Sequence, residues 1–196
     1  MRPLIMAILL ATIPVHGAER YEIDKAHAFV TFTVPHFLLD EASGSFGDVS
    51  GSLVYDPEQL ANCSVAVTVK AASIETNVDA RDAHLRSADF FNVEKYPDIT
   101  FVSRSMRKAK EGYVATGDLT LHGITRTVDV PFTVHGPVKD PLPLGVKRLG
   151  VRAAMKVNRR DFGIVWSRVM DDGTLFVGND VTLRIHFEAV VPKSAS

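Results

Sequence analysis

Apolar and polar side chains alternate with a period of two through most of this chain, and this periodicity constrains the fold more than any other feature. Such alternation is typical of β-strands that bury one face. The pattern predicts about eight strands and almost no helix. The clearest rows lie at 28–34, 65–70, 118–122, 127–134, 151–157 and 181–188, and the segments 49–55 and 99–105 fit as well.

Short turn signals separate these rows, for example His122-Gly123 and Glu111-Gly112. Short connections favour antiparallel neighbours, and closing the sheet removes its exposed edges. We therefore predict an all-β fold, a single antiparallel β-barrel of about eight strands. A two-sheet sandwich remains the rival, because the pattern alone does not exclude it. Pro131 within a strand pattern indicates an edge or a bulge.

One stretch, residues 77–92, lacks the two-residue period and is predicted to be a short helical insertion. Asn77 or Asp79 can cap it, Leu85 and a Phe pair give it an apolar face, and Pro97 prevents its continuation.

The first 18 residues have the pattern of a secretory signal peptide. Arg2 is the single charge before Glu19, an apolar run from Leu4 to Val15 follows it, and the small residues 17 and 18 offer a cleavage point. We expect residues 19–196 to form one exported domain. No repeat or second domain is apparent in the sequence.

The charge balance and the motifs exclude several function classes. The net charge is −1, and it becomes −2 when Arg2 is removed with the signal peptide, which argues against nucleic acid as a partner. No zinc-ligand spacing, Gly-x-Ser-x-Gly elbow or phosphate loop occurs. We therefore expect no metal, no cofactor and no catalytic residues, and we expect the histidines to bond to backbone or Asp partners.

Phenylalanine is frequent, with 11 residues, and some of these side chains fall on the phase opposite their strand's aliphatic row. They are either ordinary core with some exposed aromatics or the lining of a cavity. A barrel of about eight strands can hold one slender ligand. Arg81, Asp82 and His84 share the helical insertion, either as a solvated helix face or as a polar site for a ligand head group.

A set of motifs then occurs in a fixed order along residues 21–188. They are Tyr21-Glu22-Ile23-Asp24, His27, His36, Gly44-Ser45-Phe46, Ser73-Ile74-Glu75-Thr76, the Arg81–Phe91 segment, Tyr96-Pro97, Gly117 to Thr125, Asn158 to Ile164, and Val177 to Val181. Each motif alone is weak, but the ordered set closely resembles the YceI-like family of secreted bacterial proteins.

The resemblance implies an elongated, lipocalin-like barrel in the periplasm that binds polyisoprenoid chains or related amphiphiles, such as isoprenoid quinones, without catalysis. Two departures, Leu38 and Ala28, leave the specificity for the head group open. We therefore predict a carrier with a bound isoprenoid lipid as its ligand. Candidate tunnel residues are Phe29, Phe32, Phe46, Leu85, Phe90, Phe91, Phe101 and Trp166, and candidates for the polar end are His36, Arg81, His84 and Arg159.

Two other hypotheses stay open. In the first, the protein is a non-catalytic envelope interaction module, whose sheet edge or Phe37–Leu39 patch docks a membrane redox protein such as a cytochrome. Transient contact with the inner membrane and a homodimer also remain open. The second is an enzyme that acts on the lipid head group, and it requires a His/Asp/Arg cluster beside the cavity.

Overall fold

The computed structural model describes residues 17–37, 39–139, 145–171, 173 and 175–192. The predicted signal peptide lies outside these residues except for Gly17 and Ala18. Strands dominate the chain. In order, its elements are β1 (Glu19–His36), β2 (Asp40–Phe46), β3 (Val49–Tyr55), η1 (Leu60–Asn62), β4 (Ser64–Lys70), η2 (Ala71–Ser73), β5 (Ile74–Glu75), α1 (Asp79–Arg86), β6 (Asp98–Lys108), β7 (Tyr113–Leu121), β8 (Ile124–Lys139), β9 (Lys147–Asn158), η3 (Arg159–Phe162) and β10 (Asp180–Val190).

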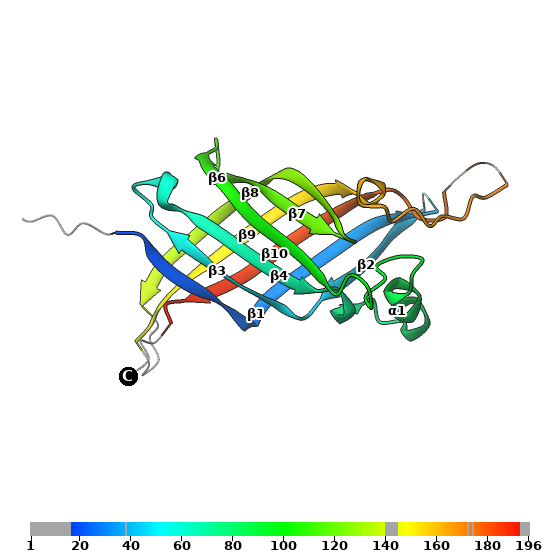
Figure 1. The fold of residues 1–196 in the computed structure, drawn as a ribbon, viewed down its shortest axis with the longest axis horizontal. Coiled ribbons are helices and arrows are strands. Elements are labelled where there is room, and N and C mark those ends of the chain that lie inside the picture. The colour runs from blue at the N-terminus through cyan, green and yellow to red at the C-terminus, as the bar shows by residue number, and fades with distance from the viewer. Residues whose placement is uncertain (1–16, 38, 140–144, 172, 174, 193–196) are drawn as a thin grey trace, which may run out of the picture.

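Eight of the strands close into an antiparallel ring, in the order β1-β3-β4-β6-β7-β8-β9-β10 and back to β1 (Figure 1). The ring closes at β1, because one edge of this strand pairs with β10 from Glu22 to Thr33 and the other pairs with β3 from Glu19 to Glu22. The predicted barrel is confirmed, and the sandwich is excluded.

Two further strands extend one end of the barrel. The pairing of β1 with β10 shifts between Ile23 and Ala28, and beyond this irregularity β1 pairs with β2 from Val30 to His36. The short β5 then adds to β2 opposite Ser45 and Phe46. These pairings explain why the structure has ten strands where the pattern predicted about eight.

Local turn chemistry agrees with the sequence at two places. His122 and Gly123 both have a positive φ, 51° and 74°, and they join β7 to β8 as a tight hairpin. Pro131 pairs with β7 on one side, whereas the pairing of β8 with β9 starts at the next residue, Phe132. The proline therefore lies where β8 still has an unpaired edge, as predicted.

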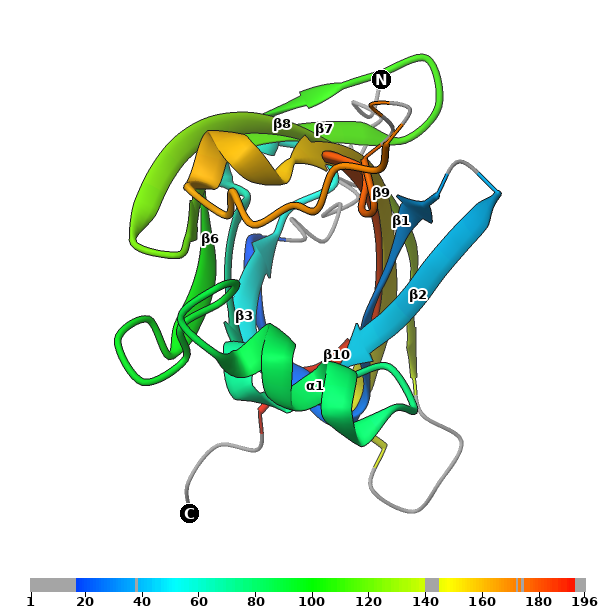
Figure 2. The ribbon, with the colours of Figure 1, turned by 90° about the vertical axis from the view of Figure 1, so that its right-hand side faces the viewer.

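The helical insertion is shorter than predicted. Hydrogen bonds of Asp82 and Arg86, within the helix, attach it to the preceding segment. Val78 occupies the N-cap of α1, and no side chain caps it there. Instead Thr76 donates a hydrogen bond of 2.5 Å to Asp82, and Arg86 donates to the carbonyls of Ala72 and Ile74. Backbone turns follow from Ser87 onward. We call the end of the barrel that carries α1 the helix end (Figure 2).

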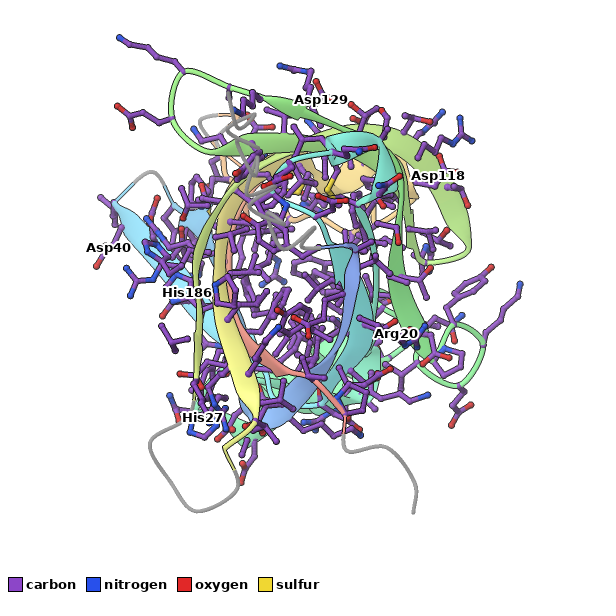
Figure 3. The ribbon with its side chains drawn as sticks, turned by 90° about the vertical axis from the view of Figure 1, so that its left-hand side faces the viewer. Arg20, His27, Asp40, Asp118, Asp129 and His186 are labelled. Atoms are coloured by element: carbon purple, nitrogen blue, oxygen red, sulfur yellow. The ribbon has the colours of Figure 1, made fainter. Side chains whose placement is uncertain are left out.

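Seen from the opposite end, Arg20, His27, Asp118, Asp129 and His186 lie around the outside of the ring (Figure 3). Buried apolar residues form two clusters inside. One is centred on Tyr21, Val49, Ile74 and Leu149, and the other on Phe90, Phe162 and Ile164. Among the described residues, no helix is long and apolar enough to span a membrane.

Candidate functional site

An apolar cavity lies inside the barrel. The cavity volume is about 140 Å³. The interior of a barrel of eight strands can hold one small or slender ligand. All eight strands of the ring line it, with Val30, Leu53, Tyr55, Val67, Ile99, Phe101, Met106, Leu119, Phe132, Met155, Leu183, Ile185 and Phe187 among the lining residues.

The cavity wall carries no charged side chain among the residues that line it, and two of them bear hydroxyls, Tyr55 and Thr100. Thr100 lies between Ile99 and Phe101 on the opposite phase of β6. Tyr55 is therefore the inward-phase residue of the described wall that carries a polar group, and the exposed surface of the wall is almost entirely apolar. Such a wall offers burial to a hydrocarbon chain and almost no hydrogen bonds.

The predicted tunnel residues lie at different places around this cavity. Phe101 lines it directly. Phe32, Phe46 and Phe91 pack together toward the helix end, where the Phe32 and Phe46 ring centroids are 5.8 Å apart and those of Phe46 and Phe91 are 5.6 Å apart. Leu85 of α1 packs against both buried clusters. These residues cap the interior at the helix end.

Phe90 and Trp166 belong to a chain of aromatic contacts across the helix end. The Trp166 ring lies 5.1 Å from Phe90, 5.1 Å from His84 and 6.2 Å from Phe176. Phe176 in turn contacts His36 and Phe37. We call the six residues His36, Phe37, His84, Phe90, Trp166 and Phe176 the aromatic cluster. It joins the β1–β2 turn, α1 and the segment after η3.

The prediction for Phe29 is wrong. Its side chain is 55% exposed and borders a groove on the outer surface beside His186. The reason is strand phase, because Ala28, Val30 and Val34 are the buried residues of this part of β1. Ring size suggested a lining residue, but Phe29 lies on the opposite face of the same strand.

Most of the cavity-lining residues that the sequence prediction does not include lie in the alternating rows. Phe132, Met155 and Ile185 occupy the regular inward phase of β8, β9 and β10. Following the phase of each strand, and not aromatic residues alone, would have identified them. Met106 follows an irregularity of β6 between Ser103 and Ser105, which shifts the inward phase, whereas Tyr55 continues the phase of Leu53 as the last residue of β3.

The four residues predicted for a polar end lie at the helix end, and none of them is among the residues that line the cavity. Arg81 donates to the hydroxyl and the carbonyl of Thr76, both at 2.7 Å. His84 Nε2 lies 2.9 Å from Asp89 Oδ2. His36 belongs to the aromatic cluster. The polar groups of Arg81 and His84 thus interact with groups of the protein.

Arg159 is a structural residue of this end. It is 5% exposed and donates hydrogen bonds to the carbonyls of Ile164, Trp166, Val177 and Gly178 at 2.6–3.3 Å. Burial lowers the pKa of its guanidinium. Because these carbonyls lie on both arms of the segment between η3 and β10, Arg159 holds the two arms together.

The opposite end of the barrel is different, and we call it the tyrosine end. Glu19, Tyr21, Tyr55, Tyr113 and Lys147 lie there, at the ends of β1, β3, β7 and β9. The Tyr21 hydroxyl donates to Glu19 at 2.7 Å, and Lys147 Nζ lies 3.0 Å from both oxygens of the same carboxylate. Burial, followed by the hydrogen bond to and the charge of the neighbouring Tyr113 phenol, raises the pKa of Tyr55.

One group of side chains on the outer surface has metal-ligand character. The ligand atoms of Asp24, His27 and Glu188 lie within 4.8 Å of one another. Arg148 Nη1 already lies 2.8 Å from Asp24 and 2.7 Å from Glu188. The bonds from Arg148 and then from His27 lower the pKa of Asp24. The guanidinium therefore occupies the position of a cation, and the group is an ion-pair cluster.

The prediction that histidines bond to backbone groups or to Asp side chains is confirmed at three positions. His27 pairs with Asp24 and His84 with Asp89, both at 2.9 Å, and His122 Nδ1 lies 3.1 Å from the carbonyl oxygen of Phe162.

Comparison with known proteins assigns the family. A profile of the YceI-like domain matches residues 21–189. The chain belongs to the YceI-like family. This YceI-like chain is 43% identical over 147 residues to a UPF0312 protein of Photorhabdus laumondii, covering 74% of this chain and 76% of the relative. It is 42% identical over 149 residues to the protein YceI of Escherichia coli, covering 75% and 77% of the two chains.

Solved structures of similar proteins share the barrel. The YceI protein of Campylobacter jejuni is 29% identical, with a TM-score of 0.68 over 79% of this YceI-like chain and 88% of that protein. Burkholderia cenocepacia BcnA is 24% identical, with a TM-score of 0.74 over 85% and 98%. A polyisoprenoid binding domain from Saccharophagus degradans is 14% identical, with a TM-score of 0.65 over 90% and 100%. At such identities the last two establish the common fold.

Proposed function

We propose that this protein is a non-catalytic carrier or buffer for a long-chain isoprenoid lipid, such as an isoprenoid quinone, in the periplasm. The apolar cavity carries the proposal, because its wall suits a hydrocarbon chain and little else. The family assignment and the polyisoprenoid binding domain from Saccharophagus degradans support the ligand class.

The energetics of burial are sufficient for tight binding. Each CH₂ group moved from water into an apolar interior contributes roughly 0.8 kcal/mol. A chain of about twenty carbons gains on the order of 15 kcal/mol before ordering costs remove several kcal/mol. No charged contact is required for affinity of this size.

Two measurements test the proposal. Organic-solvent extraction of the protein purified from its periplasm, followed by mass spectrometry, should release a prenyl lipid. Uptake of added prenyl quinone should then be compared for Ala153→Phe and Ala154→Phe. Ala153 lines the cavity, whereas its neighbour Ala154 is exposed on the outer face of β9.

We expect Ala153→Phe to weaken uptake by roughly tenfold or more, since overpacking costs about 1–3 kcal/mol. Ala154→Phe should bind like the unmodified protein. An extract free of lipid, combined with no uptake of added quinone, would remove the carrier proposal. Equal binding by the two variants would place the lipid outside the barrel.

A second candidate is a docking module for another envelope component, such as a membrane cytochrome. Exposed apolar side chains at the helix end favour it, namely Leu39 at 87%, Val169 at 61%, Val165 at 59% and Met170 at 43% exposure. Phe37 of the predicted patch packs in the aromatic cluster, and Leu38 lies outside the described residues. Normal lipid uptake after Val169→Ser, with loss of a membrane partner in crosslinking, would assign docking to this end.

A further inference from the structure

At the tyrosine end, the inward-facing residues of β3 and β7 change from apolar side chains to tyrosines. Along β3, Leu53 lines the apolar cavity and Tyr55 follows on the same phase. Along β7, Ala115 lines the cavity and Tyr113 precedes it on the same phase. A strand repeats its facing direction every two residues. The two phenols therefore face the interior where the apolar rows end.

Tyr55 lies at the boundary between two spaces. It lines the apolar cavity, and it also lines an adjoining polar pocket together with Glu19, Tyr21, Lys139 and Lys147. The Tyr113 ring packs 5.5 Å from Phe132, which is itself a cavity residue. The two phenols thus lie where the hydrocarbon-like interior meets the first polar groups.

We propose that the head group of the bound lipid lies at the tyrosine end, where an uncharged oxygen of that group, a carbonyl or a hydroxyl, hydrogen-bonds to the Tyr55–Tyr113 pair. The hydrocarbon chain then extends toward the helix end. This inference rests on the proposed function, because it orients the same ligand in the same cavity.

The chemistry of the pair suits such an oxygen. Each phenol has one proton to donate and lone pairs to accept. A ligand oxygen that reaches this boundary can therefore accept the proton of a phenol. A buried carbonyl or hydroxyl without such a partner costs free energy, so the head group should lie where a donor faces the cavity.

The charges favour an uncharged group over a phosphate. Lys147, which lies beside Tyr21 and Tyr55 in the polar pocket, is already bonded to both oxygens of Glu19 at 3.0 Å. A phosphate at the phenols would lie near that carboxylate. Lys139 lines the same pocket and is the cation through which a phosphate would have to bind.

The test compares three probes that differ only in the head. They are geranylgeraniol, the matching hydrocarbon without the hydroxyl, and geranylgeranyl monophosphate. Affinities are measured by displacement of a fluorescent apolar dye from the purified protein. The variants are Tyr55→Phe and Tyr113→Phe, with Tyr96→Phe as the matched control. Tyr96 lies outside the cavity lining and contacts His122.

We expect Tyr55→Phe and Tyr113→Phe each to weaken geranylgeraniol binding by roughly three- to tenfold, the worth of one hydrogen bond. Their affinity for the hydrocarbon should be unchanged, and Tyr96→Phe should change neither. Thermal denaturation of each variant verifies that the barrel is intact.

Two results would overturn the inference while leaving the proposed function standing. One is equal loss of affinity for alcohol and hydrocarbon, and the other is tighter binding of the phosphate that depends on Lys139. If none of the three probes displaces the dye from the unmodified protein, the proposed function itself fails.

Discussion

The two ends of the barrel use polar side chains in opposite ways. At the helix end, Arg81, Arg86 and Arg159 donate to carbonyls of the chain, and aromatic rings cover the interior. At the tyrosine end, Tyr55 and Tyr113 continue the inward phase of Leu53 and Ala115. The arginines thus bind the chain itself at one end, whereas at the other end the phenols form the proposed site for the ligand head group.

At each end, a buried ionic residue also holds a loop in place. Arg159, 5% exposed, serves the helix end by donating to carbonyls. Asp56, 3% exposed, serves the tyrosine end, because its carboxylate accepts from the backbone amides of Glu58 and Gln59 and from the side chain of Asn62. The loop that Asp56 organises begins immediately after Tyr55. The comparison therefore predicts different consequences when each residue is replaced.

The largest effect is expected for Arg159→Met. Four carbonyls would lose their charged donor in a buried site, so the free energy of unfolding should fall by about 3–5 kcal/mol. Chemical denaturation measures this change. Arg160→Met is the control, since this exposed neighbour should change stability by no more than about 0.5 kcal/mol. Similar losses for both variants would show that Arg159 does not hold the helix end together.

Trp166→Ala should loosen the aromatic cluster without opening the rest of the barrel. Aromatic pairs contribute about 0.5–1.5 kcal/mol each, and Trp166 contacts three rings. Losing about 1.4 kcal/mol raises the population of an opened helix end roughly tenfold. Dissociation of bound prenyl quinone into lipid vesicles, followed by stopped-flow fluorescence, should accelerate accordingly.

Val165→Ala provides the control for Trp166→Ala, because Val165 is 59% exposed. If the dissociation rate of Trp166→Ala equals that of Val165→Ala, the ligand leaves by the tyrosine end and the aromatic cluster is a permanent plug.

Asp56→Asn should lower stability by less than Arg159→Met. Asparagine keeps the size of the side chain but presents its amide as a weaker acceptor, and a donor group then faces Asn62. Denaturation curves of Asp56→Asn and of the exposed neighbour Glu58→Gln supply the measurement. A loss as large as that of Arg159→Met would contradict the ranking of the two ends.

The architecture of the barrel was readable from the sequence because its determinants are local. Alternating rows predict strands with one buried face, and His122-Gly123 is a turn whose residues tolerate positive φ. The irregularity in β1 between Ile23 and Ala28 was not readable. It depends on one strand changing partners from β3 to β2, which involves residues far apart in the chain.

The candidate site was predicted less well, for two physical reasons. Phe29 was selected for its large ring, although strand phase decides which side chains face inward. Arg159 resembled a ligand contact, because the four carbonyls that accept its bonds belong to loop residues that only the folded chain brings together. Tyr55 and Tyr113 continue the phase of Leu53 and Ala115, and a choice based on aromatic motifs and not on strand phase does not include them.

The smallest expected effect is a difference in how the stability contributions of Asp56 and Arg159 depend on pH. The bond from Asn62, followed by those from the amides of Gln59 and Glu58, lowers the pKa of Asp56 below its ordinary 3.8. A carboxylate with a depressed folded pKa stabilises the protein above its unfolded pKa and loses that contribution as the pH falls toward the folded pKa. The stability difference between the unmodified protein and Asp56→Asn should therefore be constant near neutrality and shrink below about pH 4.

The difference between the unmodified protein and Arg159→Met should persist over the same range, because the guanidinium stays protonated even though burial lowers its pKa. Asp24 and Asp129, whose pKa values are also lowered, are common to all three proteins, and distant contributions largely cancel in such differences. Denaturation at a series of pH values measures both curves. Parallel curves would mean that the carboxylate of Asp56 contributes no pH-dependent stability, so the two ends would not differ in the way their buried ionic residues act.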